Sequence, residues 1–464
     1  MSLEQYKRII CDSIASATAW ILFFGYRKII IEESIFEFSN TLLYGTIGVT
    51  LFWITIYSLS GNYKDVLRVS RINELYKTLT QSIAGCFIIF FFLIIDDIEN
   101  YKNYQFYYEA LAILILLHFS ITFPIRYILT NSIVRKIQSR KIQFKTILIG
   151  DSKSIIQTCN KLTEMPRSMG HRLIGYINCD DFKDIAQINI SNLGQIQNLQ
   201  EILKKHDIEE AILTFDKNKS RDITMIIHSL IYNNIITKIT PDLVDFFSGN
   251  LKTYSLFNPS LIEIPQIKMP VFQAFMKRII DVFLSALALI ILSPVLITTA
   301  IIIKLTSPGP VFYYQERIGY KKNLFNIIKF RSMFIDAEDG TPLLSSSNDS
   351  RITNWGKIMR KYRIDEIPQF YNVLIGEMSI VGPRPEREFF AKKILKKAPQ
   401  YNLIHKVKPG ITSWGMVKFG YAENVDEMIS RLRYDIIYLY NLSLFYDLQV
   451  LIWTIFIVLQ GRGK

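Results

Sequence analysis

The chain has 464 residues, of which 50% are apolar, and its formal net charge is +13 at pH 7. It is too long for one ordinary domain and too apolar for a wholly soluble protein. Its Lys and Arg residues flank apolar runs instead of forming one basic stripe, which favours membrane lipid as a partner and argues against nucleic acid. The four cysteines are scattered without metal-ligand spacing, which argues against a zinc site or a disulfide framework.

Four apolar segments in the first 132 residues approach the length of about 20 residues that a helix needs to cross a bilayer. They are Ile9–Tyr26, Leu42–Leu59, Leu79–Ile95 and Ala110–Leu129. The connection after the second segment is basic, the one around Asp96, Asp97 and Glu99 is acidic, and the tract after the fourth is basic. The positive-inside rule therefore predicts a transmembrane domain over 1–132 with both ends in the cytoplasm, although Arg27 and Lys28 then lie outside.

Short apolar strands alternate with helical segments between residues 143 and 265, which predicts a doubly wound α/β domain. The expected strands are Lys145–Gly150, Leu173–Asn178, Glu210–Phe215 and Ile235–Thr240. The expected helices are Asp151–Leu162, Gln197–His206 and Asp222–Asn233. A strand that runs into Gly150 and a helix is typical of a Rossmann-like opening, but the segment after it lacks the remaining glycines of the dinucleotide fingerprint. We therefore expect a degenerate Rossmann-like domain with a structural or regulatory role rather than a bound cofactor.

The segment from Met276 to Pro310 is long and apolar, with Ser293-Pro294 in its middle. Proline removes a backbone hydrogen bond and clashes with the preceding turn, so a sharp bend is expected there. Two structures fit this pattern: a kinked spanning helix, or a helix over 277–305 that enters the cytoplasmic leaflet and returns. Basic residues at both ends favour the re-entrant helix, because both ends then lie at the same anionic face.

The chemistry-bearing residues lie beyond this bend. Asp365 and Glu366 stand among basic residues, and a carboxylate in such surroundings is expected to keep a low pKa, stay ionised and be able to attack phosphorus. Successive helical side chains point in different directions, so the two carboxylates are expected to divide two tasks, with Glu366 next to a divalent cation. Lys329, Arg331 and Arg384 match the donors that a nucleotide diphosphate needs, although each alone is more typical of a membrane-surface or solvent-exposed charge. Among the histidines only His405 lies near these motifs.

Taken together, these motifs resemble those of the bacterial sugar transferase family, the monotopic polyprenyl-phosphate hexose-1-phosphate transferases. The segments that carry the resemblance are SPGPVFYYQERIG, KFRSM, RIDEIPQFYNVLIGEMSIVGPRP and KPGIT, within Phe272–Lys464. The resemblance implies a membrane α-helical bundle of four transmembrane helices, an α/β Rossmann-like domain over 143–265, and an α/β monotopic catalytic domain over 271–464 with a re-entrant membrane helix.

The resemblance also implies roles for individual residues. Asp365 is expected to be the nucleophile, Glu366 the partner that holds Mg²⁺, and Ser293-Pro294 the break in the re-entrant helix. The expected substrate-binding residues are Lys329, Arg331, Arg360, Pro383, Arg384, Lys408 and Thr412.

The implied reaction has two steps at the cytoplasmic face of the bacterial inner membrane. Asp365 attacks the β-phosphorus of a UDP-sugar and releases UMP, and undecaprenyl phosphate then takes the sugar phosphate from the enzyme. UDP-glucose or UDP-galactose is the expected donor, and the size of the membrane bundle favours a homodimer. This transfer is the first membrane step of exopolysaccharide, O-antigen or glycoprotein glycan assembly.

One segment departs from the family's pattern, and two other functions remain open. The family commonly reads KPGITG-x-x-Q, whereas this chain has Ser413 in place of the second Gly and Met416 in place of the Gln. This difference leaves nucleotide and sugar contacts from this loop in doubt. A membrane-anchored nucleotide-sugar dehydratase would need a bound nicotinamide, and the missing glycine fingerprint argues against it. A non-catalytic scaffold for polysaccharide export would not depend on Asp365. The terminal run Leu442–Gln460 fits a surface-lying membrane helix or a core helix.

Overall fold

The computed structural model describes residues 2–31, 33–96, 105–165, 168–179, 188–215, 220–240, 261–335 and 349–460. The chain divides into two compact units. The first consists of Met1–Phe144 with two short additions, Met165–His171 and Pro270–Phe272, and the second contains the remaining residues. Asp97 and Glu99, on which part of the predicted topology rests, lie outside the described residues.

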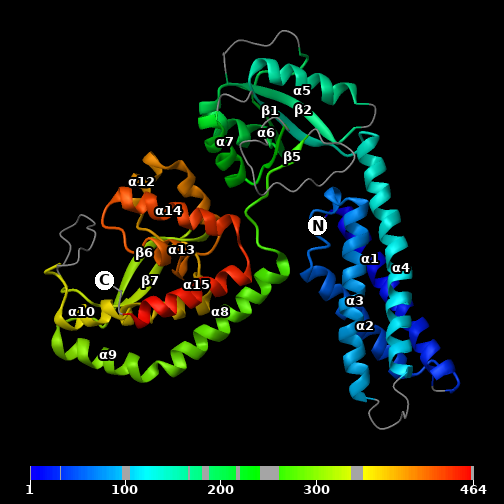
Figure 1. Cartoon of the computed structure of the whole chain (residues 1–464), viewed down its shortest axis with the longest axis horizontal. Helices are drawn as coiled ribbons and strands as arrows, with labels where there is room; N and C mark the ends of the chain where they lie inside the picture. The colour runs from blue at the N-terminus through cyan, green and yellow to red at the C-terminus, as the bar shows by residue number, and fades with distance from the viewer. Residues whose placement is uncertain are drawn as a thin grey trace. The chain divides into compact units, whose positions relative to one another are not determined.

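The first unit is a bundle of α1 (Leu3–Tyr26), α2 (Asn40–Leu59), α3 (Arg71–Asp96) and α4 (Gln105–Gln138). Helix α4 packs against α1 and α3, and α2 packs against α1 (Figure 1). In the described part of the chain, four helices are long and apolar enough to cross a membrane, which confirms the four expected apolar helices. Helix α3 begins eight residues earlier than its apolar segment, because Ser70 accepts a hydrogen bond from the backbone N–H of Asn73.

The interior of this bundle contains a charged network that the apolar pattern did not reveal. Arg126 of α4 donates two hydrogen bonds to Asp12 of α1, at 2.7 and 2.8 Å, and both side chains are fully buried. Glu74 of α3 pairs with Arg8 of α1 and lies 3.9 Å from Arg126. Two arginines therefore balance two carboxylates among three helices, where an unpaired charge would be expensive.

The second unit begins with an α/β sheet, whose strands in the described residues run in the order β2-β1-β3-β4-β5. They are β1 (Phe144–Gly150), β2 (His171–Asn178), β3 (Glu210–Thr214), β4 (Ile236–Ile239) and β5 (Ile262–Glu263). Strands β1, β3 and β4 pair in parallel, and β5 joins antiparallel. The expected alternation is therefore present, with β5 as an unexpected addition, and the Rossmann-like assignment remains a prediction.

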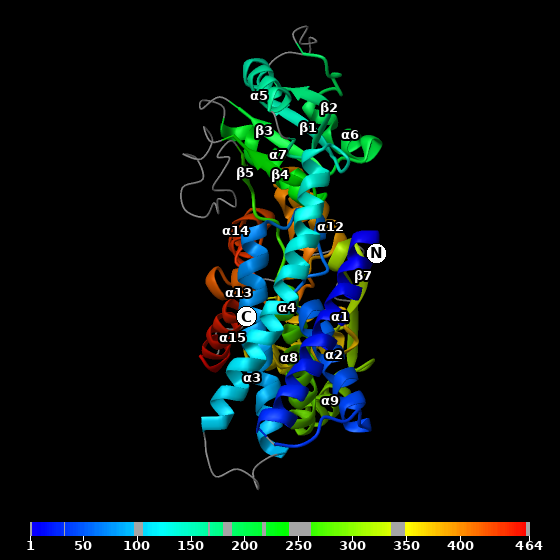
Figure 2. The same cartoon turned by 90° about the vertical axis from the view of Figure 1, so that its right-hand side faces the viewer.

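Helices cover both faces of this sheet (Figure 2). The helices are α5 (Ser152–Glu164), α6 (Leu199–His206) and α7 (Ser220–Tyr232). Leu148 and Ile212 pack against α5, whereas Ile147 and Ile149 on the opposite face pack with residues of α6 and α7. Because successive strand residues point to opposite faces, the nearly continuous apolar strands fit a sheet that is buried on both sides.

The predicted bend lies between α8 (Val271–Ile291) and α9 (Ser293–Thr306), which meet at an angle of 59°. Pro294 stands at the start of α9, where its missing N–H leaves no helical hydrogen bond unmade. Large apolar side chains such as Phe283, Ile290 and Leu305 are 64%, 70% and 80% exposed, as on a surface that faces lipid. The bend is thus confirmed, whereas the re-entrant path remains a prediction.

The rest of the second unit follows α9. Strands β6 (Phe312–Ile318) and β7 (Leu324–Phe330) form an antiparallel hairpin. Strands β8 (Ser379–Val381) and β9 (Gly410–Thr412) pair in parallel. The helices are α10 (Asn354–Lys361), η6 (Ile364–Glu366), α11 (Gln369–Ile375), α12 (Glu388–Lys397), η7 (Pro399–Lys406), α13 (Trp414–Lys418), α14 (Val425–Tyr440) and α15 (Leu444–Leu459).

Two contacts attach the bent pair of helices to this part of the chain. Asp281 of α8 accepts a hydrogen bond of 3.1 Å from the backbone N–H of Ile380 in β8. Lys277 of α8 forms an ion pair of 2.6 Å with Asp447 of α15. Helix α15 buries Val450 completely but leaves Phe445 77% exposed, so one of its faces packs on the core while the other presents apolar side chains.

Candidate active site

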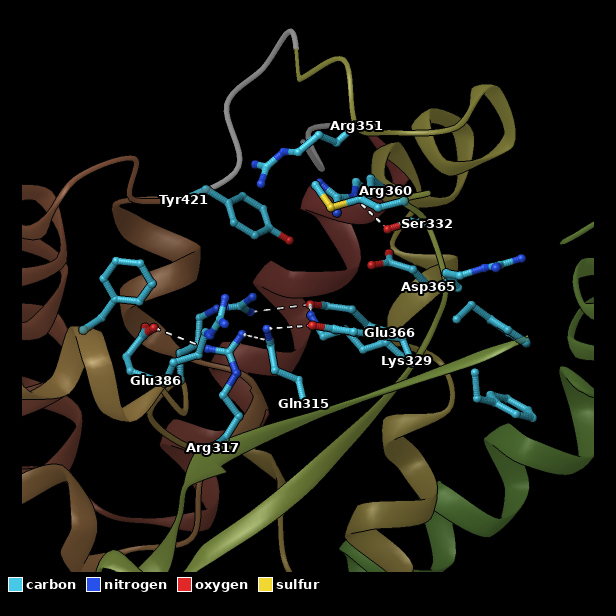
Figure 3. Close-up of a pocket in the computed structure, with 18 of the residues that line it drawn as sticks. Gln315, Arg317, Lys329, Ser332, Arg351, Arg360, Asp365, Glu366, Glu386 and Tyr421 are labelled. Atoms are coloured by element: carbon cyan, nitrogen blue, oxygen red, sulfur yellow. Dashed lines mark hydrogen bonds and ion pairs between the residues drawn. The ribbon is translucent and has the colours of Figure 1, made fainter. Parts of the chain in front are cut away.

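A pocket of about 540 Å³ opens between the β6–β7 hairpin, α10, η6 and the segment after β8 (Figure 3). Cationic side chains outnumber carboxylates in its described lining, which is the pattern expected of a site for a polyanionic ligand. The cations are Arg317, Lys329, Arg331, Arg351, Arg360, Arg384, Arg387 and Arg431. The carboxylates are Asp365, Glu366 and Glu386.

Glu366 is fixed by three cations. Its Oε1 lies 2.9 Å from Lys329 Nζ and 3.5 Å from an Arg384 nitrogen, and its Oε2 lies 2.9 Å from an Arg363 nitrogen. Burial acts to raise the pKa of Glu366, but the nearby charges of Lys329, Arg363 and Arg384 hold that pKa well below its usual range. Glu366 is therefore a permanently ionised side chain that organises the cations around it.

Asp365 differs sharply from its neighbour. It is 8% exposed and lines the pocket, yet its carboxylate makes no hydrogen bond or ion pair with any residue that the structure describes. Burial and the charge of Glu366 raise the pKa of Asp365, which outweighs the lowering by Lys329, Arg360 and Arg363. The expected low pKa of Asp365 is thus wrong, because burial and the charge of Glu366 outweigh the nearby cations. A carboxylate without competing partners keeps its oxygens available to a ligand.

The local fold explains why the two carboxylates stand here. Arg363 adopts a left-handed backbone with φ 58°, and the chain then makes the single 3₁₀ turn η6 that carries Asp365 and Glu366. Helix α10 precedes it and approaches the segment after β7 closely, since a Cβ at Gly356 would fall 2.1 Å from the carbonyl oxygen of Ser332. The absence of a side chain at Gly356 therefore allows this close approach.

Four of the seven predicted substrate-binding residues line the pocket, namely Lys329, Arg331, Arg360 and Arg384. Arg360 donates a hydrogen bond of 2.9 Å to Ser332 Oγ, which holds it beside the pocket. Arg331 also has a structural role, since its guanidinium donates to the carbonyl oxygens of Ser307, at 2.8 Å, and Pro308. It thereby ties the end of α9 to the end of β7.

The other three predicted substrate-binding residues do not line the pocket. The carbonyl oxygen of Pro383 accepts a hydrogen bond of 3.0 Å from the N–H of Gly410, and Thr412 Oγ1 lies 2.7 Å from Thr454 Oγ1 of α15. Lys408 lies near the turn at Gly376 instead. Pro383 thus links the segment after β8 to β9, and Thr412 links β9 to α15, so the positions of these two residues in the motifs are explained by packing. Ser293 and Pro294 likewise lie at the helix bend and do not line the pocket.

Several pocket residues were not foreseen. Arg317 lies within the segment SPGPVFYYQERIG, and Glu386 directly follows the segment that ends at Pro385. The two side chains form an ion pair of 3.5 Å, and Glu386 also pairs with Arg431. Charge within or next to the motifs was the available signal. Tyr421 lies in the connection between α13 and α14 and carried no signal of its own.

The residues around Glu366 do not fit a magnesium site as they lie here. No group of three or more His, Cys, Asp or Glu side chains among the described residues is placed to hold a metal ion. Both carboxylate oxygens of Glu366 already face cations, and a further cation beside three positive charges would be repelled. Mg²⁺ therefore remains a prediction from the resemblance, and no step of the proposed reaction depends on it.

His405 lies outside the pocket, 4% exposed, with Nδ1 3.2 Å from the carbonyl oxygen of Gly319. Burial lowers its pKa to about 4, against a smaller raising effect of that carbonyl. The ring is therefore neutral at pH 7 in the folded protein and stabilises the β6–β7 turn.

This lowered pKa predicts an acid-sensitive stability. Between pH 6.5 and about 4 the unfolded chain binds a proton at His405 and the folded chain does not, so stability is lost as pH falls through this window. At about 1.4 kcal/mol per pKa unit, the loss is about 3 kcal/mol at most. The thermal midpoint of the detergent-purified protein should fall less over this window in His405→Gln than in wild type. His206→Gln, at a partly exposed position, is the control and should follow wild type.

Comparison with known proteins places the chain in a family. The family described as bacterial sugar transferase matches residues 272–461. A UDP-N-acetylgalactosamine-undecaprenyl-phosphate N-acetylgalactosaminephosphotransferase of Aeromonas hydrophila is 42% identical over 190 residues, which are 41% of this chain and 45% of that protein. A UDP-glucose:undecaprenyl-phosphate glucose-1-phosphate transferase of Xanthomonas campestris pv. campestris is 30% identical over 317 residues, which are 67% of this chain and 65% of that protein.

A third relative is matched over nearly its whole length. It is an exopolysaccharide production protein of Rhizobium leguminosarum bv. phaseoli, 36% identical over 195 residues, which are 41% of this chain and 97% of that protein. The match to the first two relatives, by contrast, spans 45% and 65% of their lengths. The residues that match the family include the bent helix pair and the whole lining of the pocket. The chain therefore belongs to the bacterial sugar transferase family.

Proposed function

We propose that this protein transfers a hexose 1-phosphate from a UDP-sugar to undecaprenyl phosphate through a covalent intermediate on Asp365. The observation that supports this most directly is the contrast between the two adjacent carboxylates. Glu366 is held by three cations, whereas Asp365 faces a cationic pocket with no partner among the described residues. The names of the relatives from Aeromonas hydrophila and Xanthomonas campestris support the same donor and acceptor classes.

The proposed reaction balances in two steps. A carboxylate oxygen of Asp365 attacks the β-phosphorus of the UDP-sugar, a new P–O bond forms, and the bond to the UMP oxygen breaks. UMP leaves as the phosphate monoester, and the sugar phosphate remains as an acyl phosphate. A phosphate oxygen of the acceptor then attacks that phosphorus and regenerates the free carboxylate. Lys329, Arg360 and Arg384 are placed to offset the negative charge that gathers on the phosphoryl oxygens.

The membrane placement is part of this proposal. The bend of 59° between α8 and α9 and their exposed apolar side chains support a re-entrant helix pair that dips into the cytoplasmic leaflet. Such a pair would hold Asp365 at headgroup depth, where a water-soluble nucleotide and the phosphate of a buried polyprenol can both reach it. The four spans of the first unit would anchor the chain in a bacterial inner membrane, as a homodimer.

The test is release of UMP from purified membranes that contain the protein. We expect release with one UDP-hexose and its increase when undecaprenyl phosphate is added; a panel of UDP-glucose, UDP-galactose and UDP-N-acetylgalactosamine identifies the sugar. The third is included because it appears in the name of the Aeromonas hydrophila relative. A parallel series with EDTA tests the predicted Mg²⁺ requirement. Failure of every donor to yield UMP, with and without acceptor, would contradict the proposed function.

A further inference from the structure

Tyr421 is the pocket residue whose position calls for an explanation. It lies in the short connection between α13 and α14, and Figure 3 shows its hydroxyl directed into the pocket. Gly420 precedes it with φ 93°, a left-handed conformation that a residue with a side chain rarely adopts, and this turn presents the tyrosine to the pocket.

The ring of Tyr421 lies over the two arginines that hold Glu366. Its centroid is 5.7 Å from the guanidinium carbon of Arg363 and 5.5 Å from that of Arg384, both within the range of a cation–π contact. Glu366 therefore holds these guanidinium groups at one side and Tyr421 covers them at another. The tyrosine orders the pair of arginines that border the reacting carboxylate.

Helix α13 adds a second contact to the same arginines. The sulfur of Met416 lies 3.4 Å from a nitrogen of Arg384 and 3.9 Å from a nitrogen of Arg363. A thioether is a weak acceptor, so it excludes water without withdrawing the arginines from Glu366. The helix is itself anchored, because the N–H of Gly415 donates a hydrogen bond of 2.9 Å to the buried Asp435. The segment that departs from the family's pattern thus has a defined place beside the pocket.

The hydroxyl of Tyr421 has no hydrogen-bond partner among the residues that the structure describes. Burial and the charge of Glu366 raise the pKa of Tyr421, so the phenol keeps its proton at neutral pH. It is a neutral donor in a pocket whose other donors are cations. An O–H in this position is satisfied by an acceptor that enters with the ligand.

We propose that Tyr421 contacts the donor substrate, with its O–H donating to an oxygen of the diphosphate while its ring positions Arg363 and Arg384. This inference rests on the proposed function and deepens it. A phosphate oxygen is the acceptor, because the cations that line the same pocket, among them Arg351, Arg360 and Arg384, would draw the diphosphate into it. Negative charge that builds on the phosphoryl oxygens during transfer strengthens such a hydrogen bond.

Two substitutions separate the hydroxyl from the ring. Tyr421→Phe keeps the ring over both arginines and removes only the O–H, and we expect kcat/KM for the UDP-sugar to fall about tenfold, mainly in kcat, at an unchanged thermal midpoint. Tyr421→Leu also removes the ring and should lower kcat/KM about a hundredfold. Tyr440→Phe, which changes a 42% exposed tyrosine on α14, is the matched control and should keep wild-type kinetics.

The outcomes distinguish this inference from the proposed function. If Tyr421→Phe releases UMP at a rate within twofold of wild type, the proposed role of the hydroxyl is overturned and the proposed function stays intact. A loss in Tyr421→Phe that is accompanied by a lower thermal midpoint, large enough to account for it, would also overturn that role, since the effect is then structural. Absence of UMP release in wild type with every donor overturns both.

Discussion

Asp365→Asn is expected to lower UMP release by about 10⁴-fold or more, because the amide offers no anionic oxygen to form the acyl phosphate. The replacement has nearly the same shape, and the Asp365 carboxylate has no protein partner in the described residues that the amide would disrupt. The fold and the affinity for the UDP-sugar should therefore remain close to wild type. The measurement is initial UMP release by purified membranes at saturating donor and acceptor.

The control and a trapping experiment make this prediction specific. Asp426→Asn replaces an aspartate on the surface whose side chain is 76% exposed and pairs with Lys397 at 2.7 Å, and it should leave the rate unchanged. When wild type is mixed with donor labelled in the sugar and quenched without acceptor, the label should remain on the protein, and Asp365→Asn should retain none. Normal turnover by Asp365→Asn would contradict the covalent mechanism.

The coarse architecture follows from the sequence because strong local rules govern it. Apolar length identified the four helices of the first unit, and a proline in an apolar run located the bend before Pro294. Alternating apolar segments predicted strands β1 to β4 within two residues of their ends. The short strand β5 was missed, because two residues leave no periodic pattern to detect.

Site residues that lie in the sequence motifs could be predicted, whereas residues that the fold brings in from distant segments could not. Lys329, Arg360 and Arg384 line the pocket with the two carboxylates as expected. Lys408 and Thr412 do not line it, and the Thr412 side chain joins β9 to α15 instead, which shows that a motif residue can serve packing rather than a ligand. Tyr421 was missed, since its role depends on a turn that brings it over arginines of two other segments.

The pKa of Asp365 shows why charge pattern alone is insufficient. Counting nearby Arg and Lys residues predicts a low value for both carboxylates. Three of the cations pair with Glu366, however, and the resulting ionised Glu366 raises the pKa of its neighbour together with burial. Side-chain geometry decides which carboxylate pairs with the cations, and the sequence pattern does not reveal that geometry.

The charged network in the first unit leads to the largest expected effect on stability. Arg126→Met leaves Asp12 buried without its bidentate partner, and breaking such a pair costs about 3–5 kcal/mol. Arg126 and Asp12 are 114 residues apart in the chain and belong to different helices, so the loss should also weaken the packing of α1 on α4. The measurement is the thermal midpoint of the detergent-purified full chain, with aggregation followed by size-exclusion chromatography.

A double variant tests whether the cost lies in the uncompensated charge or in the lost contact. Asp12→Leu with Arg126→Met removes both charges, so we expect it to be more stable than Arg126→Met alone, because no buried ion is left without a partner. Lys7→Met serves as the control, since Lys7 is 47% exposed, pairs with Glu4 at 3.5 Å and should contribute less than about 1 kcal/mol. If Arg126→Met unfolds at the wild-type midpoint, the network contributes nothing to the bundle. If the double variant is as unstable as the single one, the contacts of Arg126 with Glu74 and the ring of Tyr57, rather than the charge balance, stabilise this unit.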